Sequence, residues 1–247
     1  MSGFTSGFHW IANPAHWSGN DGIPNRFFEH VELSVVALVV AALIAVPIGL
    51  AVGHTRKGQI VAVQTANLGR AIPSFAILSL VFLVVVRNFP SLAFGFLPTF
   101  VALTLLGIPP ILVNTYVGIQ QIDPDTVEAA RGMGMSGRQV LLGLEMPLAT
   151  PLIMTGLRLS AVTIVATATL SALIGGGTFG RYIVDGSAQQ DIPMEVAGAI
   201  LVAALAIATE LFFSLLTRIT APRLTSGSRR VPTTEDRAWQ TSRPASP

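Results

Sequence analysis

Five long apolar stretches, separated by short segments that carry charges, glycine or proline, dominate the pattern of hydrophobic and polar positions. They run over residues 31–53, 60–86 (strongest from 72 to 86), 96–119, 147–174 and 196–219. Each of them is long enough for a membrane-spanning α-helix, which needs about 20 apolar residues. Transmembrane β-strands instead alternate apolar and polar residues over about ten positions. The pattern therefore predicts an all-α, polytopic membrane protein with five transmembrane helices.

The composition agrees with this fold class. Of 247 residues, 51% are hydrophobic and only 11% are charged, whereas an average soluble domain has about 25% charged residues. A soluble enzyme of this length needs more charge to cover its surface, so an ordinary cytoplasmic enzyme is excluded. The net charge of +2 gives no support for a nucleic-acid partner.

Residue types that serve catalysis are scarce. The chain has no cysteine, which excludes disulfides, thiol nucleophiles and thiolate metal sites. Its histidines lie outside the apolar stretches and form no H-E-x-x-H motif. We therefore predict that the chain is not an enzyme and has no catalytic residue, no metal site and no cofactor of its own.

The basic residues are distributed unequally between the two sides of the predicted bundle. Ten of them follow the first, third or fifth stretch, whereas Arg26, Arg87 and Arg181 lie on the other side. Cytoplasmic loops are enriched in such residues, so we expect the N-terminus outside and the C-terminus inside. The predicted organisation is an extracytoplasmic segment (1–30), a transmembrane domain (31–220) with a cytoplasmic loop (120–146), and a disordered cytoplasmic tail (221–247).

The N-terminal segment carries Trp10 and Trp17 among glycine, serine and asparagine. Because tryptophan is favoured at the membrane interface, the segment could lie along the outer surface. The alternative is a loosely ordered terminus.

The sequence has no nucleotide-binding motif in the structural context that such a motif requires. Residues 132–137 and 175–180 match G-x-G-x-x-G literally, but a dinucleotide site needs this pattern between a strand and a helix. Both matches follow helical sequence instead. The only lysine, Lys57, precedes Gly58 rather than serine or threonine, so a P-loop is absent.

The loop between the third and fourth stretches contains residues that are typical of a short helix and of a sharp turn after it. Asp123 and Pro124 are typical of the N-cap and first position of a helix. Ala129 and Ala130 keep the side of that helix small, and the glycines that follow permit a sharp exit. A short helix held between two spans could pass movement from a cytoplasmic partner into the membrane; alternatively, it merely joins them.

This loop resembles the signature of permease subunits of ABC importers, which is E-A-A, three residues, glycine, nine residues and an I-x-L-P ending. Glu128, Ala129, Ala130, Gly134 and Pro147 fall at the matching positions. Leu144 and Met146 replace isoleucine and leucine, which keeps their apolar character.

The resemblance extends to the branch that imports glycine betaine, choline, carnitine and related osmoprotectants. Residues 71–78, 110–119, 128–135 and 168–175 look like segments of that branch, and the similarity covers roughly residues 30–220. It implies the type I ABC importer permease fold and a multi-pass location in the cell membrane.

The resemblance also implies roles and partners. The residues expected to couple the chain to an ATPase are Glu128, Ala129, Ala130, Arg131, Gly132, Gly134 and Pro147. The expected partners are ABC ATPase subunits that bind ATP and Mg²⁺, a second permease (identical or paralogous), an extracytoplasmic solute-binding protein and the lipid bilayer. Solute selection is expected to belong to the binding protein.

Hydroxyl side chains follow one face of the fourth stretch at three- and four-residue spacing. Small residues of this kind are typical of helix packing in membranes; the alternative is that they line a solute path. The candidate path residues in this stretch are Ser160, Thr163, Thr167 and Ser171. Asn114 and Tyr116 in the third stretch are further candidates.

Two charged residues within the stretches need partners, because unpaired charge in a bilayer is expensive. Arg158 is expected near the inner edge, where it extends to water or meets a carboxylate. Glu210, in the middle of the fifth stretch, is expected to face protein, in an ion pair or in the path.

Other functions remain as alternatives. Another ABC importer branch, for amino acids or methionine, shares the E-A-A loop. A proton- or sodium-driven carrier usually has paired repeats and several ionisable residues at mid-membrane, which five spans and an isolated Glu210 do not provide.

Overall fold

The computed structural model describes residues 2–57, 60, 64 and 72–220, and within these ranges the secondary structure is helical. This confirms the predicted all-α class. Four helical stretches are long and apolar enough to cross a membrane: 23–55, 96–120, 137–174 and 192–219. The predicted second span includes α4 (Ser74–Asn88), an apolar helix of 15 residues. Part of that prediction, over residues 61–63 and 65–71, lies outside the described residues, so the count of five stays a prediction.

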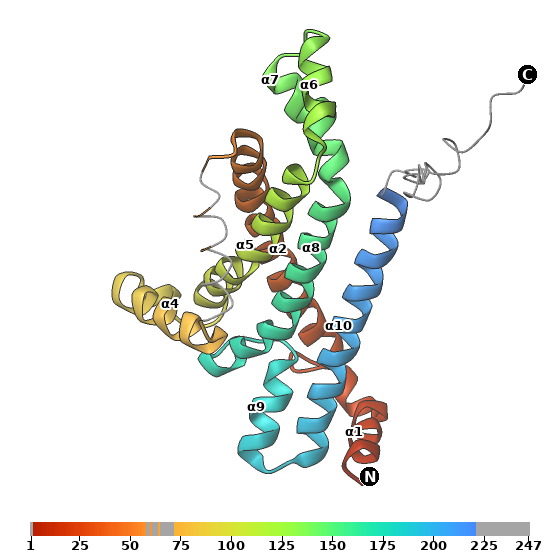
Figure 1. The fold of residues 1–247 in the computed structure, drawn as a ribbon. Coiled ribbons are helices and arrows are strands. Elements are labelled where there is room, and N and C mark those ends of the chain that lie inside the picture. The colour runs from red at the N-terminus through yellow and green to blue at the C-terminus, as the bar shows by residue number, and fades with distance from the viewer. Residues whose placement is uncertain (1, 58–59, 61–63, 65–71, 221–247) are drawn as a thin grey trace, which may run out of the picture.

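Three helices form the core: α2 (Ile23–Thr55), α5 (Phe96–Gln120) and α8 (Met146–Thr167) pack against one another (Figure 1). Helix α4 lies against α5, and α10 (Ile192–Thr220) lies against α8. The short helices α6 (Pro124–Gly132) and α7 (Gly137–Val140) are at one end of the bundle, here called the loop end. Helices α1 (Ser2–Ala12) and α9 (Gly180–Gln189) contact α10 at the opposite end, here called the N-terminal end.

Four short helical segments complete the described chain. They are the 3₁₀ helices η1 (Pro14–Trp17), η2 (Pro90–Leu92) and η4 (Ala168–Ile174), and the π-helical turn η3 (Leu141–Glu145). Thus the predicted fourth span, 147–174, is an α-helix that is preceded by a π turn and changes to a 3₁₀ helix in its last part.

The N-terminal segment is helical and packed, which disfavours the loosely ordered alternative for these residues. A Cβ added at Gly7 of α1 would lie 2.7 Å from Cγ1 of Val196 in α10, so the two helices touch closely. Trp10 stacks on His16 with ring centroids 3.7 Å apart and meets Tyr182 of α9 edge-on. The segment therefore adds a helix to the flank of α10.

Small residues repeat every fourth position along the buried side of α2. These are Ala37, Ala41, Ala45, Gly49 and Gly53, and all of them are buried. A Cβ at Gly49 would lie 2.7 Å from Cβ of Thr115, and one at Gly53 would lie 2.6 Å from Cβ of Ile119. Because residues i and i+4 share a helical face, this small-residue stripe lets α2 lie close to α5 along its length.

The faces that point away from the core are apolar. Large exposed side chains include Leu43 on α2, Leu80 and Leu83 on α4, and Ile207 and Leu211 on α10. Exposed apolar surface of this extent does not suit water but does suit lipid. The chain is therefore embedded in a membrane.

The three core helices meet at Gly107, in the middle of α5. A Cβ there would lie 2.8 Å from both Cδ1 of Ile164 and Oγ of Ser160, and 3.1 Å from Cβ of Ala41. Two prolines follow within α5, at 109 and 110, and each removes a backbone donor. The hydroxyl of Ser160 donates to the carbonyl of Gly107 at 3.0 Å. A side chain of α8 thus hydrogen-bonds to the backbone of α5 next to the two prolines.

We expect Gly107→Ala to lower the free energy of unfolding by about 1–3 kcal/mol, because the added methyl group overpacks the contact of three helices. Equilibrium unfolding in mixed micelles measures this change. Gly3→Ala is the matched control, since a Cβ at that position would have no atom of the described chain within 4 Å apart from its chain neighbours and the backbone of its own helix. Equal stabilities of the two variants would contradict the proposed tight contact.

An ion pair joins α8 to α10. Arg158 donates from its guanidinium to the carboxylate of Glu210, and both side chains are partly exposed. Of the alternatives that the sequence left open, the structure shows a carboxylate partner for Arg158 and an ion pair for Glu210. The pair neutralises two charges that would each be costly alone in a bilayer.

Glu210→Gln is expected to lower the free energy of unfolding by about 3 kcal/mol, because it leaves the guanidinium without a countercharge in the membrane. Replacing both residues with leucine should restore much of this loss, since no charge then remains. The same micelle unfolding assay checks both variants. Thr209→Ala serves as the control, because the hydroxyl of Thr209 donates to the carbonyl of Leu205 in its own helix. A Glu210→Gln variant as stable as this control would refute the expectation.

Candidate functional site

The loop between α5 and α8 folds as the sequence predicts at its start. Asp123 caps α6 by accepting a hydrogen bond from the backbone N–H of Asp125 at 3.0 Å, and Pro124 takes the first helical position. The chain leaves α6 through Gly134, whose φ of +88° lies in the left-handed region that favours glycine. Ser136 and Gln139 then form a capping box at the start of α7. These local signals fix a rigid helix–turn–helix connection.

The two faces of α6 differ. Val127 packs on an apolar cluster around Leu50 and Ile119, and Ala130 is only 3% exposed. Glu128 and Ala129 are exposed away from this cluster, and Glu128 also borders the cavity described next. Of the two predicted small residues, Ala130 thus contacts the bundle and Ala129 leaves an outer face on which another surface could lie closely.

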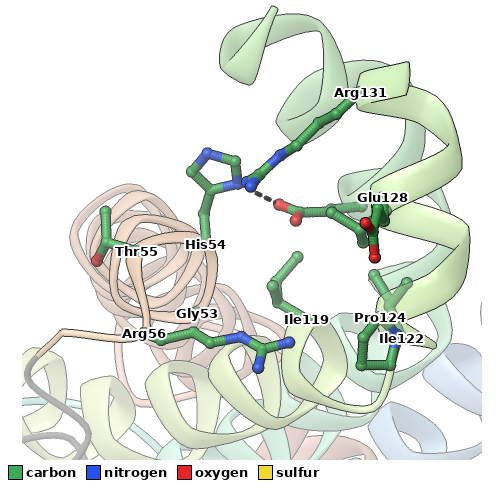
Figure 2. Close-up of a pocket in the computed structure, with 11 residues that line it drawn as sticks. Gly53, His54, Thr55, Arg56, Ile119, Ile122, Pro124, Glu128 and Arg131 are labelled. Carbon is green, nitrogen blue, oxygen red and sulfur yellow. Dashed lines mark hydrogen bonds and ion pairs between the residues drawn. The ribbon is translucent and has the colours of Figure 1, made fainter. Parts of the chain in front are cut away.

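A cavity of about 610 Å³ lies between the end of α2, the end of α5, α6 and η3 (Figure 2). Its lining combines three cationic or ionisable bases with two carboxylates and several apolar residues. The polar lining residues are His54, Thr55, Arg56, Glu128, Arg131 and Glu145. The predicted coupling residues Glu128 and Arg131 therefore share this cavity with residues from outside the loop.

The most buried polar contact of the cavity joins His54 to Glu145. Nδ1 of His54 donates to Oε2 of Glu145 at 2.6 Å, the contact drawn as a dashed line at His54 in Figure 2. Glu145 is only 4% exposed. Neither residue was a sequence candidate, because 91 positions separate them. The available signal was a carboxylate directly after the apolar run 140–144, which must find a partner if it is buried.

The remaining coupling candidates lie around the cavity rather than in it. Gly132 and Gly134 are exposed, and within the described chain a Cβ at either position would have no atom within 4 Å apart from chain neighbours and the backbone of its own helix. Pro147 is exposed in the first turn of α8. Exposed apolar side chains also gather here: Met133 is 78% exposed, and Leu142 and Met146 are exposed as well. An exposed apolar group next to charged residues is typical of a surface that binds another protein.

The six candidate path residues do not form a single wall. Ser160 and Ser171 are buried, and they donate to the carbonyls of Gly107 and Gly177 respectively, both at 3.0 Å. Asn114 donates to the carbonyl of Pro110 one turn earlier, and Tyr116 is buried. These four side chains pack between helices.

The other two path candidates differ in position. Thr163 is exposed and donates within its own helix to Leu159. Thr167 is half-buried and lies beside Ser74 of α4 and Thr99 of α5, which line a small void with it. A role of any of the six in a solute path stays a prediction.

At the N-terminal end, the glycine-rich run 175–180 packs on α2. A Cβ at Gly177 would overlap the carboxylate of Glu29. The backbone N–H of Thr178 donates to that carboxylate at 3.2 Å, and the N–H of Phe179 donates to Nδ1 of His30 at 3.4 Å. The run therefore serves as a close-packed turn between η4 and α9.

The tyrosine of α9 reinforces this end. Tyr182 donates to the backbone carbonyl of Asp21 at 2.6 Å. Burial raises the pKa of its phenol to about 12. It therefore stays a hydrogen-bond donor at neutral pH. Among the described residues, no group of three histidine or acidic side chains is placed to hold a metal ion.

Comparison with known proteins identifies the family. Residues 36–226 match the sequence model of the family described as "Binding-protein-dependent transport system inner membrane component". The chain is 34% identical over 203 residues to the glycine betaine/carnitine/choline transport system permease protein OpuCB of Bacillus subtilis (strain 168), covering 82% of this chain and 90% of that protein. It is 33% identical over 197 residues to the choline transport system permease protein OpuBB of the same organism, covering 80% and 88%.

A solved structure shares the fold. A chain of the MetNI methionine ABC transporter in an inward-facing conformation aligns with a TM-score of 0.70 at 20% sequence identity, covering 79% of this chain and 94% of that chain. The family match spans the core helices, the E-A-A loop and the His54–Glu145 contact. The chain therefore belongs to the family of inner membrane components of binding-protein-dependent transport systems.

Proposed function

We propose that this chain is the permease subunit of an ATP-driven ABC importer for an osmoprotectant such as glycine betaine, choline, carnitine or proline betaine. The observation that carries the solute class is the identity of 34% and 33% to two permease proteins whose names include choline. The alternative of a methionine or other amino-acid importer has weaker support, since the likeness to the methionine transporter is one of fold at 20% identity.

The loop end is the docking site for the ATPase in this proposal. The outer face of α6 presents Glu128 and Ala129, and the exposed Met133 and Leu142 adjoin it. A partner groove that takes up α6 would cover this mixed surface and bury its apolar part. ATP and Mg²⁺ bind in the partner, and the permease converts the partner's movement into opening of the path.

The proposed topology has five transmembrane helices, with the N-terminus outside and the C-terminus inside. The four long helices and the apolar α4 supply the spans. Arg56, Arg131 and Arg138 at the loop end support a cytoplasmic position for that end. Helices α1 and α9 then lie on the extracytoplasmic side, where the solute-binding protein delivers its cargo.

A second permease, identical or paralogous, completes the path in the proposed assembly. The exposed Thr163 and the half-buried Thr167 are the candidates for contact with solute, whereas Ser160 and Ser171 make packing contacts with other parts of the chain. Solute selection belongs chiefly to the binding protein. The cell membrane is the expected location.

Gly134→Val tests the coupling role of the loop. A β-branched residue at φ +88° costs about 1–2 kcal/mol in a left-handed conformation, so the exit from α6 shifts and docking weakens. In proteoliposomes with the ATPase, the partner permease and the binding protein, we expect uptake of choline or glycine betaine to fall about ten-fold, in line with that energy.

Gly3→Ala is the control for this experiment, because Gly3 lies in α1, outside the loop, and a Cβ there would contact no other part of the described chain. It should transport like the parent. The proposed function fails if no ABC ATPase co-purifies with the parent chain, or if Gly134→Val transports as fast as Gly3→Ala.

A further inference from the structure

The last turn of α2 carries a histidine that reaches the loop. Gly53, beside it, lies so close to α5 that a Cβ would be 2.6 Å from Cβ of Ile119. The helix ends at Thr55, because Arg56 adopts a left-handed conformation with φ of 54°. The position of His54 along α2 is therefore fixed relative to α5, and its ring points toward the connection between α6 and α8 (Figure 2).

Glu145 reaches the same point from the other side of the cavity. It is the last residue of η3, the π-helical turn between α7 and α8. A π turn contains an extra residue and therefore redirects the side chains that follow, and such turns are frequent at functional sites. The redirected carboxylate accepts the hydrogen bond from Nδ1 of His54 at 2.6 Å. The ring is also close to α7, since a Cβ at Gly137 would lie 3.6 Å from its Nε2.

This contact is the polar link between α2 and the loop. Among the side-chain hydrogen bonds and ion pairs of the described residues, it is the one that joins the segment 121–146 to another membrane helix. Elsewhere around the cavity, about 610 Å³ of space separates α6 from the end of α2. Below the cavity, Val127 and Leu141 pack on the apolar cluster around Leu50, which is non-directional contact.

The three core helices differ in how they are connected to the loop. Helices α5 and α8 continue into it through the backbone. Helix α2 has no such continuity, so movement of the loop reaches it only through side chains. A short hydrogen bond to a buried carboxylate is stronger and more directional than the apolar contact beside it.

We propose that His54 and Glu145 are positioning residues of the transport cycle. They hold α2 to the part of the loop that runs from α7 into α8, so that all three core helices move together when the ATPase moves the loop. This inference rests on the proposed function of the loop as the docking site. It assigns a task to His54, which lies outside the E-A-A signature, and to Glu145, at the position of the I-x-L-P ending where the signature specifies no residue type.

The test uses the complete transporter in proteoliposomes, with whichever of choline, glycine betaine and carnitine the parent transports fastest. The measured quantity is solute transported per ATP hydrolysed. His54→Ala and Glu145→Ala should each lower this ratio by about five-fold or more, the size typical of a lost coupling contact, while ATP hydrolysis stays within about two-fold of the parent. The double variant should be no worse than either single variant, because one contact is removed in each case.

Two further variants separate this role from a merely structural one. His54→Gln keeps an N–H donor for Glu145 and should recover most of the ratio. Thr150→Ala, one turn beyond Glu145, removes a hydroxyl that bonds at 3.0 Å to the carbonyl of Met146 in its own helix, and should leave the ratio unchanged.

The positioning role is overturned if transport and ATP hydrolysis fall in equal proportion, or if the effects of the two alanine variants add. It is also overturned, with the proposed function intact, if the parent couples normally and His54→Ala does so too. A parent that assembles without an ATPase would instead refute the proposed function, and the positioning role with it.

Discussion

The close approach of α2 to α5 is the constraint on which the rest of the fold depends. The small-residue stripe of α2, Ala37 to Gly53, removes side-chain bulk at every fourth position, so that side chains of α5 can lie against the α2 backbone. In a bilayer the hydrophobic effect does not drive helices together, and such dispersion contacts supply much of the association energy. Larger residues along this stripe would separate α2 from α5 and open the core.

The same constraint positions the loop end. Gly53 closes the stripe, and His54 follows it directly, so the imidazole is placed by helix packing rather than by local loop structure. Glu145 is placed by the π turn at the start of the α8 stretch. Two independent features of the backbone thus bring one donor and one acceptor together across the cavity, which is how a fold orients a functional pair without a local motif.

Much of this structure could be predicted from local sequence. Asp123 and Pro124 were predicted to start α6, because capping depends on neighbouring residues only. For Arg158 the sequence left two possibilities, extension to water or a carboxylate partner, since an unpaired charge in a bilayer is costly; the structure shows the carboxylate of Glu210. The family resemblance rested on Glu128, Ala129, Ala130, Gly134 and Pro147, and the family match confirms it.

Features that depend on distant residues were missed. Helix α2 begins at Ile23, whereas the apolar stretch begins only near residue 31. The first turns of the helix contain charged residues whose partners are found only in the fold: Arg26 pairs with Glu29, and Glu29 also accepts a hydrogen bond from the backbone of Thr178. Hydropathy alone ends the helix where these charges begin. The contact of His54 with Glu145 spans 91 positions, and no periodicity within one helix carries that information.

The ion pair between Arg158 and Glu210 also has a consequence for synthesis. The two residues are 52 positions apart, so the ribosome adds the arginine roughly 3–10 s before the glutamate at about 5–20 residues per second. During that interval the α8 segment has no countercharge from α10 and favours a position in which the guanidinium reaches the headgroups. Helix α8 therefore reaches its final depth in the membrane only after α10 has been inserted. Insertion of these two helices is cooperative.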